Sequence, residues 1–494
     1  MIKKSLYLLV LLAIIMQEAA SQNSQTLYFM NLPQNHLLNP ALKPSNSFYL
    51  SVPALTGINI NVNNNFVNFS DVIMPNQKGD SLISFLHPDY NPDNFLKKLK
   101  TSNFIAPEIN IQLLGLGFKA GKDMYISLDI TERVEGNFAL PKDLFVLALK
   151  GNNDFVGKTI NLTGLDARLR YYHEFGMGVS KNITSKLRIG IRGKLLFGVA
   201  NMSLNNKSLG LTVNNDYSYD FNADVSANIS APVKVYSTGN KIDSVVFDDK
   251  RLKEPSFYFN TKNMGLGVDI GAVYQLTDKI CFSASITDLG YIKWKSDVTN
   301  LQANSTFKFS GFNITDVANG TKTIDQLATE MVDSLKNSFK ISNTSTGFNT
   351  YLPTKVYLGA SYNLTKSISL GILSCSLFSG KQIREALTLS ANINLGSAIS
   401  TTVSYTAENS RYNNLGAGLA FRLGIFQIYL MTDKIPVTWN KVITKKGSGA
   451  GAQSGSIMLP TDWNTANFRF GVNIVMGNHL KKKNDKPMLS PTKH

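Results

Sequence analysis

The sequence predicts an all-β protein: a transmembrane antiparallel up-and-down β-barrel of about 14 strands, within a range of roughly 12 to 16. Apolar and polar residues alternate with a period of two over many stretches of about ten residues, which places one set on each face of a sheet. Short polar turns join these stretches, as between residues 265–276 and 280–286. One face is apolar and the other is small or polar, as in a wall between lipid and a wet lumen. A soluble antiparallel sheet also alternates, so the prediction depends on repetition along the chain.

The first 21 residues have the composition of a secretory signal peptide. Lys3 and Lys4 precede an apolar run over residues 6–16, and Ala19 and Ser21 are the small residues before the expected cleavage site. This run has about 11 residues and no later stretch is longer, whereas a membrane helix needs roughly 20. We therefore expect export. An exported chain without helical spans is secreted, periplasmic or a barrel.

The chain is strongly basic, with a formal net charge of +16. Its basic residues are spread over turns, loops and the C-terminal tail, and no recognisable nucleic-acid module is present. We expect contact with outer-membrane lipid and lipopolysaccharide, whose head groups are anionic, and not with nucleic acid. The two cysteines, Cys281 and Cys375, fall inside predicted strands, which favours two small buried thiols over a disulfide framework.

Residues 22–44 show no clean period. The inner faces of the predicted strands are rich in glycine and serine, which are too small to fill a lumen of about 14 strands. The segment supplies apolar bulk through Leu27, Phe29, Met30, Leu32, Leu37 and Leu38. We predict that it lies in the lumen as a plug, and that Asn39 and Pro40 fix its turn into the first strand.

Residues 45–476 are expected to form the barrel, beginning with one or two strands over residues 48–62 that are broken at Pro53. Further strands are expected at residues 108–118, 124–134, 167–179, 187–199, 203–213, 217–229, 255–276, 280–286, 356–364, 368–377, 387–395, 399–405, 415–423, 425–430 and 468–476.

The connections contain polar loops and two expected helices. Residues 63–103, 231–254 and 433–464 are polar loops. A helix is expected over residues 138–149, where Pro141 stands near the start. A second, amphipathic loop helix is expected over residues 316–337, because apolar residues recur there at spacings of three and four. Residues 477–494 form a basic tail, which we expect in the periplasm.

Six charged residues fall on the predicted inner face of two adjoining strands: Arg168, Arg170, Glu174, Arg188, Arg192 and Lys194. As lumen-lining residues they form a basic surface that selects anionic or amphiphilic solutes. The alternative is that these charges pair with each other or with the plug. The sequence slightly favours pairing.

Three parts of the chain resemble a Bacteroidota-type family of outer-membrane barrels of unknown function: the aromatic stretch at residues 27–33, the element Asn39-Pro40-Ala41, and residues 287–294. The chain is more distantly similar to fatty-acid-transporter-type barrels. This resemblance implies a location in the cell outer membrane and a barrel with an N-terminal segment, but it implies no activity.

No constellation of catalytic or metal-binding residues is apparent. None of the five histidines has a second His or Cys at metal-ligand spacing, and neither a nucleophile elbow nor a phosphate loop is present. His173 falls on an apolar face, which favours an interfacial ring with its hydrogen bonds satisfied. Trp294, Trp439 and Trp463 lie near strand ends, where aromatic rings mark a membrane interface. We expect neither enzyme activity nor a cofactor.

The leading functional hypothesis is the passage or binding of a hydrophobic or amphiphilic small molecule. The first alternative is a structural or secretion-accessory barrel that docks surface or secreted proteins. The second is a surface adhesin built as a β-sandwich.

Overall fold

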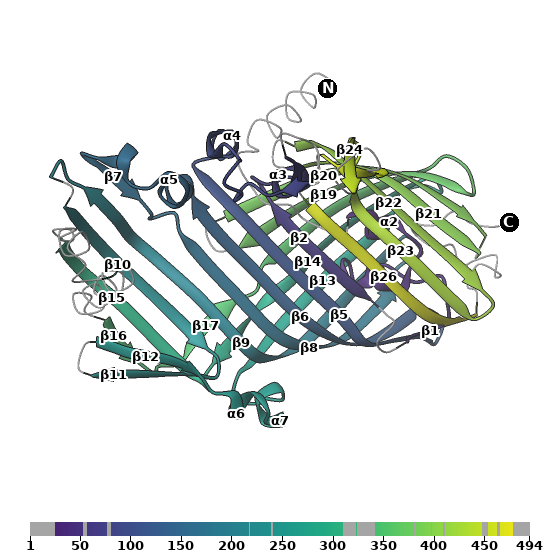
Figure 1. The fold of residues 1–494 in the computed structure, drawn as a ribbon. Helices are drawn as coiled ribbons and strands as arrows, with labels where there is room; N and C mark the ends of the chain where they lie inside the picture. Colours follow the sequence, from purple (N-terminus) through teal and green to yellow (C-terminus); the bar gives the residue numbers. More distant parts are fainter. Residues whose placement is uncertain are drawn as a thin grey trace, which may run out of the picture.

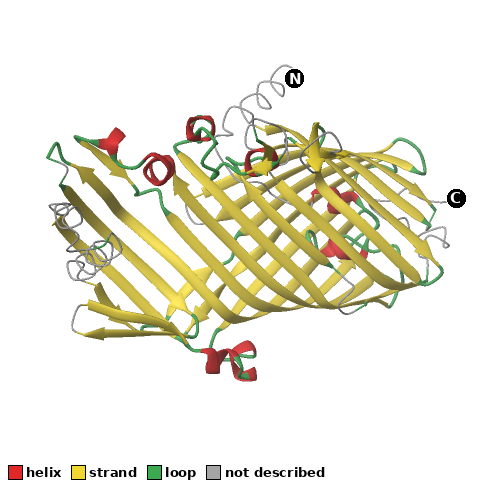
Figure 2. Ribbon diagram, viewed as in Figure 1, coloured by secondary structure: helices red, strands yellow, loops and turns green. Residues whose placement is uncertain are grey.

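The structure is a computed structural model, and it describes residues 25–52, 57–76, 81–216, 218–238, 241–309, 323, 341–379, 382–396, 398–408, 411–446, 453–461 and 465–477. The expected signal peptide, the loop helix at 316–337 apart from Thr323, and the basic tail beyond Gly477 lie outside these residues. Within the described chain, one sheet contains 20 strands. It curves round on itself (Figures 1 and 2).

The sheet closes into a barrel of 14 strands, because the last strand pairs with the first. All neighbours in the ring are antiparallel. Two short strands share the first position and pair with β26 on one side and β5 on the other. In ring order the strands are β1 (Phe48–Ser51) with β2 (Ile58–Asn64), β5 (Ser102–Ala120), β6 (Met124–Pro141), β8 (Asp166–Asn182), β9 (Leu187–Val213), β13 (Met264–Gln275), β14 (Ile280–Trp294), β18 (Thr354–Asn363), β19 (Ile368–Ser379), β20 (Gln382–Leu395), β21 (Ile399–Glu408), β22 (Arg411–Leu423), β23 (Phe426–Ile435) and β26 (Thr465–Met476). The prediction of an antiparallel barrel of about 14 strands is confirmed, and a closed ring leaves no place for the β-sandwich alternative.

The two ends of the barrel differ in the length of their connections. At one end, a few residues join β5 to β6, β8 to β9, β13 to β14, β18 to β19, β20 to β21 and β22 to β23. The tight turns there use Gly121, Gly396 and Gly424, whose φ angles of 66°, 64° and 61° favour glycine. The other end carries the long connections. We call these the short-turn end and the long-loop end.

At the long-loop end, the wall extends beyond the ring. β9 has 27 residues; its first half pairs with β13 and its second half with β10 (Tyr219–Ser230), which in turn pairs with β15 (Val298–Phe309). The two strands expected at 187–199 and 203–213 are therefore one. Shorter strands border this region: β7 (Lys158–Asn161), β16 (Ile341–Thr344) and β17 (Phe348–Tyr351).

Small elements occupy the long connections. Three separate hairpins are formed by β3 (Met74–Pro75) with β4 (Leu82–Ile83), β11 (Val233–Thr238) with β12 (Lys241–Phe247), and β24 (Trp439–Lys446) with β25 (Gln453–Pro460). The helices are α3 (Phe69–Val72), α4 (Pro92–Leu96), α5 (Lys142–Lys150), η2 (Asn153–Phe155), α6 (Asp249–Leu252) and α7 (Pro255–Tyr258). The described helices include none with the length and apolar character that a membrane span requires.

Two of these elements correct the sequence analysis. The expected helix near Pro141 is present as α5, although residues 138–141 still belong to β6. The strand expected at 255–276 begins only at Met264, because Pro255 starts helix α7 instead. The polar loop expected at 231–254 contains the β11–β12 hairpin and α6.

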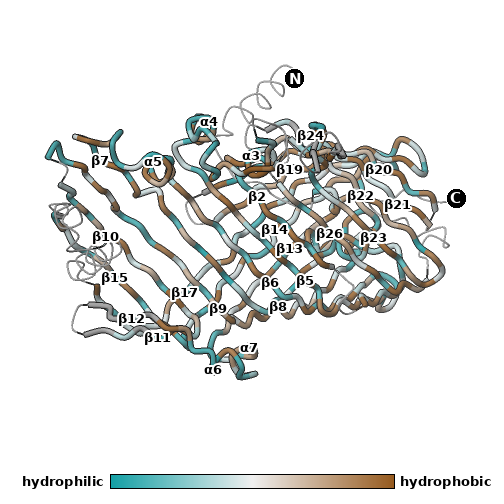
Figure 3. The backbone as a smooth tube through the Cα atoms, in the orientation of Figure 1, coloured by the Kyte–Doolittle hydropathy of each residue, from teal (hydrophilic) through white to brown (hydrophobic). Residues whose placement is uncertain are grey.

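The outer face of the wall is apolar and the inner face is small or polar, as the alternation predicts. Figure 3 shows this alternation as hydrophobic and hydrophilic residues that follow one another along the strands. In β14 the side chain of Phe282 is 46% exposed and that of Ser283 is 7% exposed. In β9 the values are 54% for Ile191 and 0% for Arg192. Large apolar side chains thus face outward on neighbouring strands, and this continuous surface is called the apolar belt below.

The alternation in β14 is interrupted at Asp288. This residue has a φ of 60°, and the register between β13 and β14 shifts at this level. Both Thr287 and Asp288 are buried as a result, and the inward face continues with Ile292 and Trp294. Trp294 is completely buried and its indole nitrogen donates to Thr350 Oγ1 at 2.8 Å. The expectation that this ring marks a membrane interface is wrong.

Candidate functional site

The described part of the N-terminal segment, residues 25–44, lies within the ring of strands. It contains helix α2 (Gln25–Phe29) and the 3-10 helix η1 (Pro33–Leu37), and all five residues of α2 are buried. In Figure 1, α2 lies behind the strands of the near wall. Thr26 contacts two strands: its backbone nitrogen donates to Asp433 Oδ1 at 2.9 Å, and its hydroxyl lies 2.8 Å from Ser404 Oγ.

An apolar cluster joins this segment to the wall. Its largest members from the segment are Leu27, Tyr28, Phe29, Met30 and Leu32, and those from the strands include Val273, Cys281, Tyr357, Leu373, Cys375, Tyr429 and Met431. The Tyr28 hydroxyl donates to Ser283 Oγ at 2.9 Å. Burial raises the pKa of Tyr28 to about 12, so this hydroxyl keeps its proton at neutral pH. Both cysteines are buried free thiols, as expected.

Asn39 ties the end of the segment to the wall. Its side-chain nitrogen lies 3.1 Å from the Tyr28 hydroxyl and 3.3 Å from the carbonyl oxygen of Ala284 in β14. A longer contact of 3.5 Å reaches the carbonyl oxygen of Ala272 in β13. Its side-chain oxygen accepts from the backbone nitrogen of Ala41 at 2.9 Å. Asn39 therefore stabilises its own turn and also contacts two adjacent strands, β13 and β14.

Inward-facing glycines let the segment approach the strands closely. A Cβ atom at Gly190 would overlap the backbone of Pro40, and one at Gly271 would overlap the side chain of Asn39. Because glycine has no side chain, the segment packs directly against the backbone of the strands at these two positions.

Two side chains of η1 connect the segment to two further strands of the wall, β26 and β6. Gln34 and Asn473 of β26 exchange hydrogen bonds of 2.7 and 3.1 Å between their amide groups. His36 Nε2 lies 2.9 Å from Asp129 Oδ2 of β6, and its Nδ1 lies 2.6 Å from the carbonyl oxygen of Pro33.

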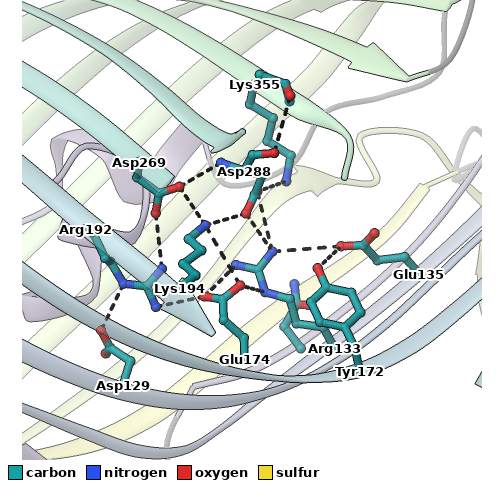
Figure 4. Close-up of polar contacts among 12 residues, drawn as sticks. Asp129, Arg133, Glu135, Tyr172, Glu174, Arg192, Lys194, Asp269, Asp288 and Lys355 are labelled. Carbon is teal, nitrogen blue, oxygen red and sulfur yellow. Dashed lines mark hydrogen bonds and ion pairs between the residues drawn. The ribbon is translucent and has the colours of Figure 1, made fainter. Parts of the chain in front are cut away.

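Asp129 belongs to a buried ion-pair network that crosses the lumen (Figure 4). At one end of it, Arg192 contacts three carboxylates: Asp129 at 3.3 Å, Glu174 at 2.8 Å and Asp269 at 3.1 Å. All four side chains are 0% exposed. Such charges are stable in a protein interior only when they are paired.

The network continues through Lys194 and Arg133. Lys194 Nζ lies 2.6 Å from Asp269 and 2.5 Å from Asp288. Arg133 Nε lies 3.0 Å from Glu174, and its Nη1 lies 3.4 Å from Asp288. Lysine and arginine here share the same carboxylates, so the charges form one connected group.

At the edge of the network, Glu135 accepts from the Tyr172 hydroxyl at 3.0 Å, and Lys355 Nζ lies 3.9 Å from Asp288. The charged members come from β6, β8, β9, β13, β14 and β18, six consecutive positions of the ring. Removing one charge would leave its partners buried without full compensation.

The six charged residues singled out in the sequence lie in different places. Glu174, Arg192 and Lys194 belong to the network. Arg170 pairs with Glu135 at 3.3 Å and donates to the Tyr351 carbonyl oxygen at 2.9 Å. Arg168 pairs with Asp166 at 2.8 Å, and Arg188 donates to the Asp123 carbonyl oxygen at 3.1 Å near the short turns. Arg168 and Arg170 thus pair with carboxylates and also line the chamber described below, whereas the contact of Arg188 is with a backbone carbonyl.

Sequence reasoning missed several partners, namely Asp129, Arg133, Asp269 and Asp288. Each is a charged residue inside an otherwise alternating strand. That signal was available for Asp129, Arg133 and Asp269, which stand on the inner parity of their strands. Their pairing depends on the register between strands that are far apart in the sequence.

A chamber of about 330 Å³ lies beside the network. Its lining combines apolar groups, such as Pro107, Tyr351 and Leu377, with charged ones. The charged residues of the lining are Glu108, Glu135, Arg168, Arg170, Lys355 and Arg384. Arg384 of β20 reaches across the lumen, where it donates to Asn137 of β6 at 2.7 Å and lies 5.6 Å from the Phe104 ring centre.

The chamber, the network and the N-terminal segment are stacked along the barrel axis. Along β9, Asn201 lines the chamber, Arg192 and Lys194 belong to the network, and Gly190 contacts the segment. β6 repeats this order, from Asn137 in the chamber lining through Arg133 to Asp129. The chamber therefore lies on the long-loop side of the network and the segment on its short-turn side.

Among the described residues, no group of three or more His, Cys, Asp or Glu side chains could hold a metal ion. The charge of the network is instead balanced by arginine and lysine.

Comparison with known proteins gives one family match. The model of DUF5723, described as a family of unknown function, matches residues 40–433. No curated protein matches the chain.

Several solved barrels are similar in outline. They include the Ralstonia pickettii toluene transporter TbuX, with 8% identity, a TM-score of 0.41 and coverage of 90% of this chain and 95% of that one. A Pseudomonas aeruginosa FadL homologue has 11% identity, a TM-score of 0.40 and coverage of 90% and 95%. The P. putida toluene transporter TodX has 10% identity, a TM-score of 0.36 and coverage of 93% and 96%. Similarity this low assigns neither a substrate nor a mechanism to the chain.

Proposed function

The chain belongs to the DUF5723 family of unknown function, and from the barrel itself we propose that it is an outer-membrane protein that binds or passes a hydrophobic or amphiphilic small molecule. The observation behind this proposal is the order of three parts along the lumen, namely the chamber, the network and the N-terminal segment. A solute that comes from the long-loop end meets the chamber first, and the network and the N-terminal segment stand between it and the short-turn end.

The outer surface supports the location. The apolar belt surrounds the strands, and strands of about ten residues are long enough to cross a bilayer at a tilt. Exposure of this belt to water would be unfavourable in free energy, and large continuous apolar surfaces are rare on soluble monomers.

The chamber supports the class of solute. Apolar lining such as Pro107 and Leu377 favours a hydrophobic body, and Arg168, Arg170 and Arg384 offer donors to a polar end. A volume of about 330 Å³ suits a small molecule and not a folded protein domain. The docking alternative finds no comparable support in the described residues.

Binding is tested with the purified barrel and two fluorescent probes, neutral N-phenyl-1-naphthylamine and anionic 1-anilinonaphthalene-8-sulfonate. Asn201→Phe places a larger side chain in the chamber lining and should weaken saturable binding at least tenfold. Asn205→Phe makes the same change in β9 beyond the lining and is the matched control. Equal binding by the two variants would contradict the chamber as the binding site.

A further inference from the structure

One element outside the barrel has a surface that the proposed function leaves unexplained. Helices α6 and α7 lie against the outside of the wall near β8 and β9, at the lower edge of Figure 1. The connection from α7 to β13 belongs with them, and together we call residues 249–262 the α6–α7 segment.

The segment is fixed to the barrel at two points. At the first point, Arg251 donates two hydrogen bonds to the carboxylate of Asp297, from Nε at 3.3 Å and from Nη2 at 3.2 Å. Its Nη1 lies 2.7 Å from Glu254 Oε2. Arg251 lies 5.7 Å from the ring centre of the buried Phe257. The segment is therefore held in place and does not trail in solution.

At the second point, the segment covers the contact between His173 and Glu132 on the outer face of the wall. His173 Nδ1 lies 2.7 Å from Glu132 Oε1, and its Nε2 lies 2.6 Å from the carbonyl oxygen of Tyr258. The Phe259 ring stacks on the imidazole at 5.8 Å. His173 has its hydrogen bonds satisfied, as the sequence favours, and α7 shields it.

The level of this contact is close to the long-loop edge of the apolar belt. From His173 to the end of β8 at Asn182 the chain has about the ten residues that a tilted strand uses to cross a bilayer. His173 pairs with Phe197 of β9, and Phe197 with Met264 of β13, so the three side chains form one outer row. The next row toward the short turns is fully apolar.

What the segment presents outward is an apolar and basic surface. Phe259 is 71% exposed and Tyr258 is 37% exposed. Lys250, Lys253 and Lys262 are exposed beside them. Of the acidic groups, Glu254 pairs with Arg251 and the neighbouring Asp248 pairs with Lys234 at 2.7 Å, while Asp249 is exposed; basic residues still outnumber acidic ones in the segment.

We infer that the α6–α7 segment is a lipid-binding site, in which Tyr258 and Phe259 enter the interface and Lys250, Lys253 and Lys262 bind the anionic phosphate of a membrane-lipid head group. Aromatic rings favour the membrane interface, and exposed lysines beside it attract anionic lipid. Continuity with the apolar belt and complementary charge select lipid over a protein partner. The inference rests on the proposed location in a membrane.

The first experiment measures depth in the full-length barrel reconstituted in vesicles. A bimane label is attached at Phe259→Cys, while the native Cys281 and Cys375 are both 0% exposed and stay unlabelled. Phospholipid with a nitroxide near the head group is the quencher. Phe282→Cys in the apolar belt is the lipid-facing control, and Tyr412→Cys, at a residue 67% exposed near the start of β22 at the long-loop end, is the aqueous control.

The inference predicts strong quenching at positions 259 and 282 and weak quenching at 412. If 282 is quenched while 259 behaves like 412, the lipid site is wrong and the membrane barrel stands. If none of the three is quenched, the membrane location itself is wrong.

The second experiment tests the head-group charge. The nitroxide is carried either by phosphatidylglycerol or by phosphatidylcholine, each as a minor lipid in phosphatidylcholine vesicles. Quenching at 259 should be at least about twofold stronger with the anionic lipid. The ratio should fall to about one in the variant Lys250→Gln, Lys253→Gln, Lys262→Gln.

Three exposed lysines of the short-turn end, Lys122, Lys279 and Lys366, provide the matched control. Their replacement by glutamine should leave the ratio at 259 unchanged. A ratio of one in the unmodified chain, or one that the first triple variant does not lower, would overturn the assignment of a phosphate-binding site.

Discussion

His36 and Asp129 form the contact by which the N-terminal segment joins the ion-pair network, with 2.9 Å between Nε2 and Oδ2. The other ring nitrogen of His36 faces the carbonyl oxygen of Pro33 at 2.6 Å. Both ring nitrogens thus lie within hydrogen-bond distance of an oxygen atom. Asp129 in turn contacts Arg192.

This contact should help to retain the segment. His36→Leu removes both hydrogen bonds, whereas His36→Gln retains one side-chain donor. We expect His36→Leu to increase spontaneous opening events in planar-bilayer recordings several-fold and His36→Gln to lie between it and the original chain. Identical recordings from all three proteins would show that the contact does not retain the segment.

The segment as a whole should limit conductance. Deletion of residues 22–38 removes α2, η1 and their cluster and should leave an assembled barrel with higher conductance in planar bilayers. Assembly is checked by the change in gel mobility on heating. A deletion variant that assembles but conducts no better than the full chain would contradict the plug.

A glycine of the wall gives a smaller change with the same expected direction. In Gly271→Val the new side chain occupies the space of Asn39, so the turn of the segment must move and conductance should rise. Gly193→Val is the control, because a Cβ there meets no atom within 4 Å. If both variants conduct like the original chain, close packing at Gly271 does not position the segment.

The network should contribute strongly to stability. Arg192→Met leaves Asp129, Glu174 and Asp269 without a shared cation, and breaking a buried ion pair costs about 3–5 kcal/mol. The double variant with Glu174→Gln removes one of the uncompensated charges and should recover part of the loss. Both free energies are measured by urea unfolding in lipid vesicles, and a loss below about 1 kcal/mol would be inconsistent with a buried network.

The wall gives the test of membrane insertion. Phe282→Arg places a cation on the belt and should cost about 2–4 kcal/mol if its level is near the midplane. Phe282→Leu keeps an apolar side chain there and should cost less than about 1.5 kcal/mol. Equal losses for the two variants would mean that the outer face does not contact lipid.

The alternation of side chains made the wall predictable from the sequence. In residues 265–276 and 280–286 the alternation predicts one apolar and one small or polar face, and the structure places Leu266 and Phe282 outward and Gly271 and Ser283 inward. Local spacing is enough for this result, because one residue along a strand always changes the face. The turns were equally visible as short polar breaks.

The network and the orientation of Trp294 were not predictable in the same way. Asp288 adopts a positive φ that is unusual for a residue other than glycine, and the change of face beyond it brings Trp294 inside. The contact of Arg192 with Asp129 depends on three-dimensional register between distant strands. The positions of these residues in the sequence do not reveal which of them pair.

The pairing of β1 and β2 with β26 has a consequence for assembly. The first strands of the chain receive their last neighbour only when residues 465–476 join the sheet, so the barrel has an open seam until its final strand is in place. The N-terminal segment is continuous with β1 and is therefore attached to one edge of that seam. If the segment is in place before the seam closes, the pairing of β26 with β1 and β2 is also the step that encloses it.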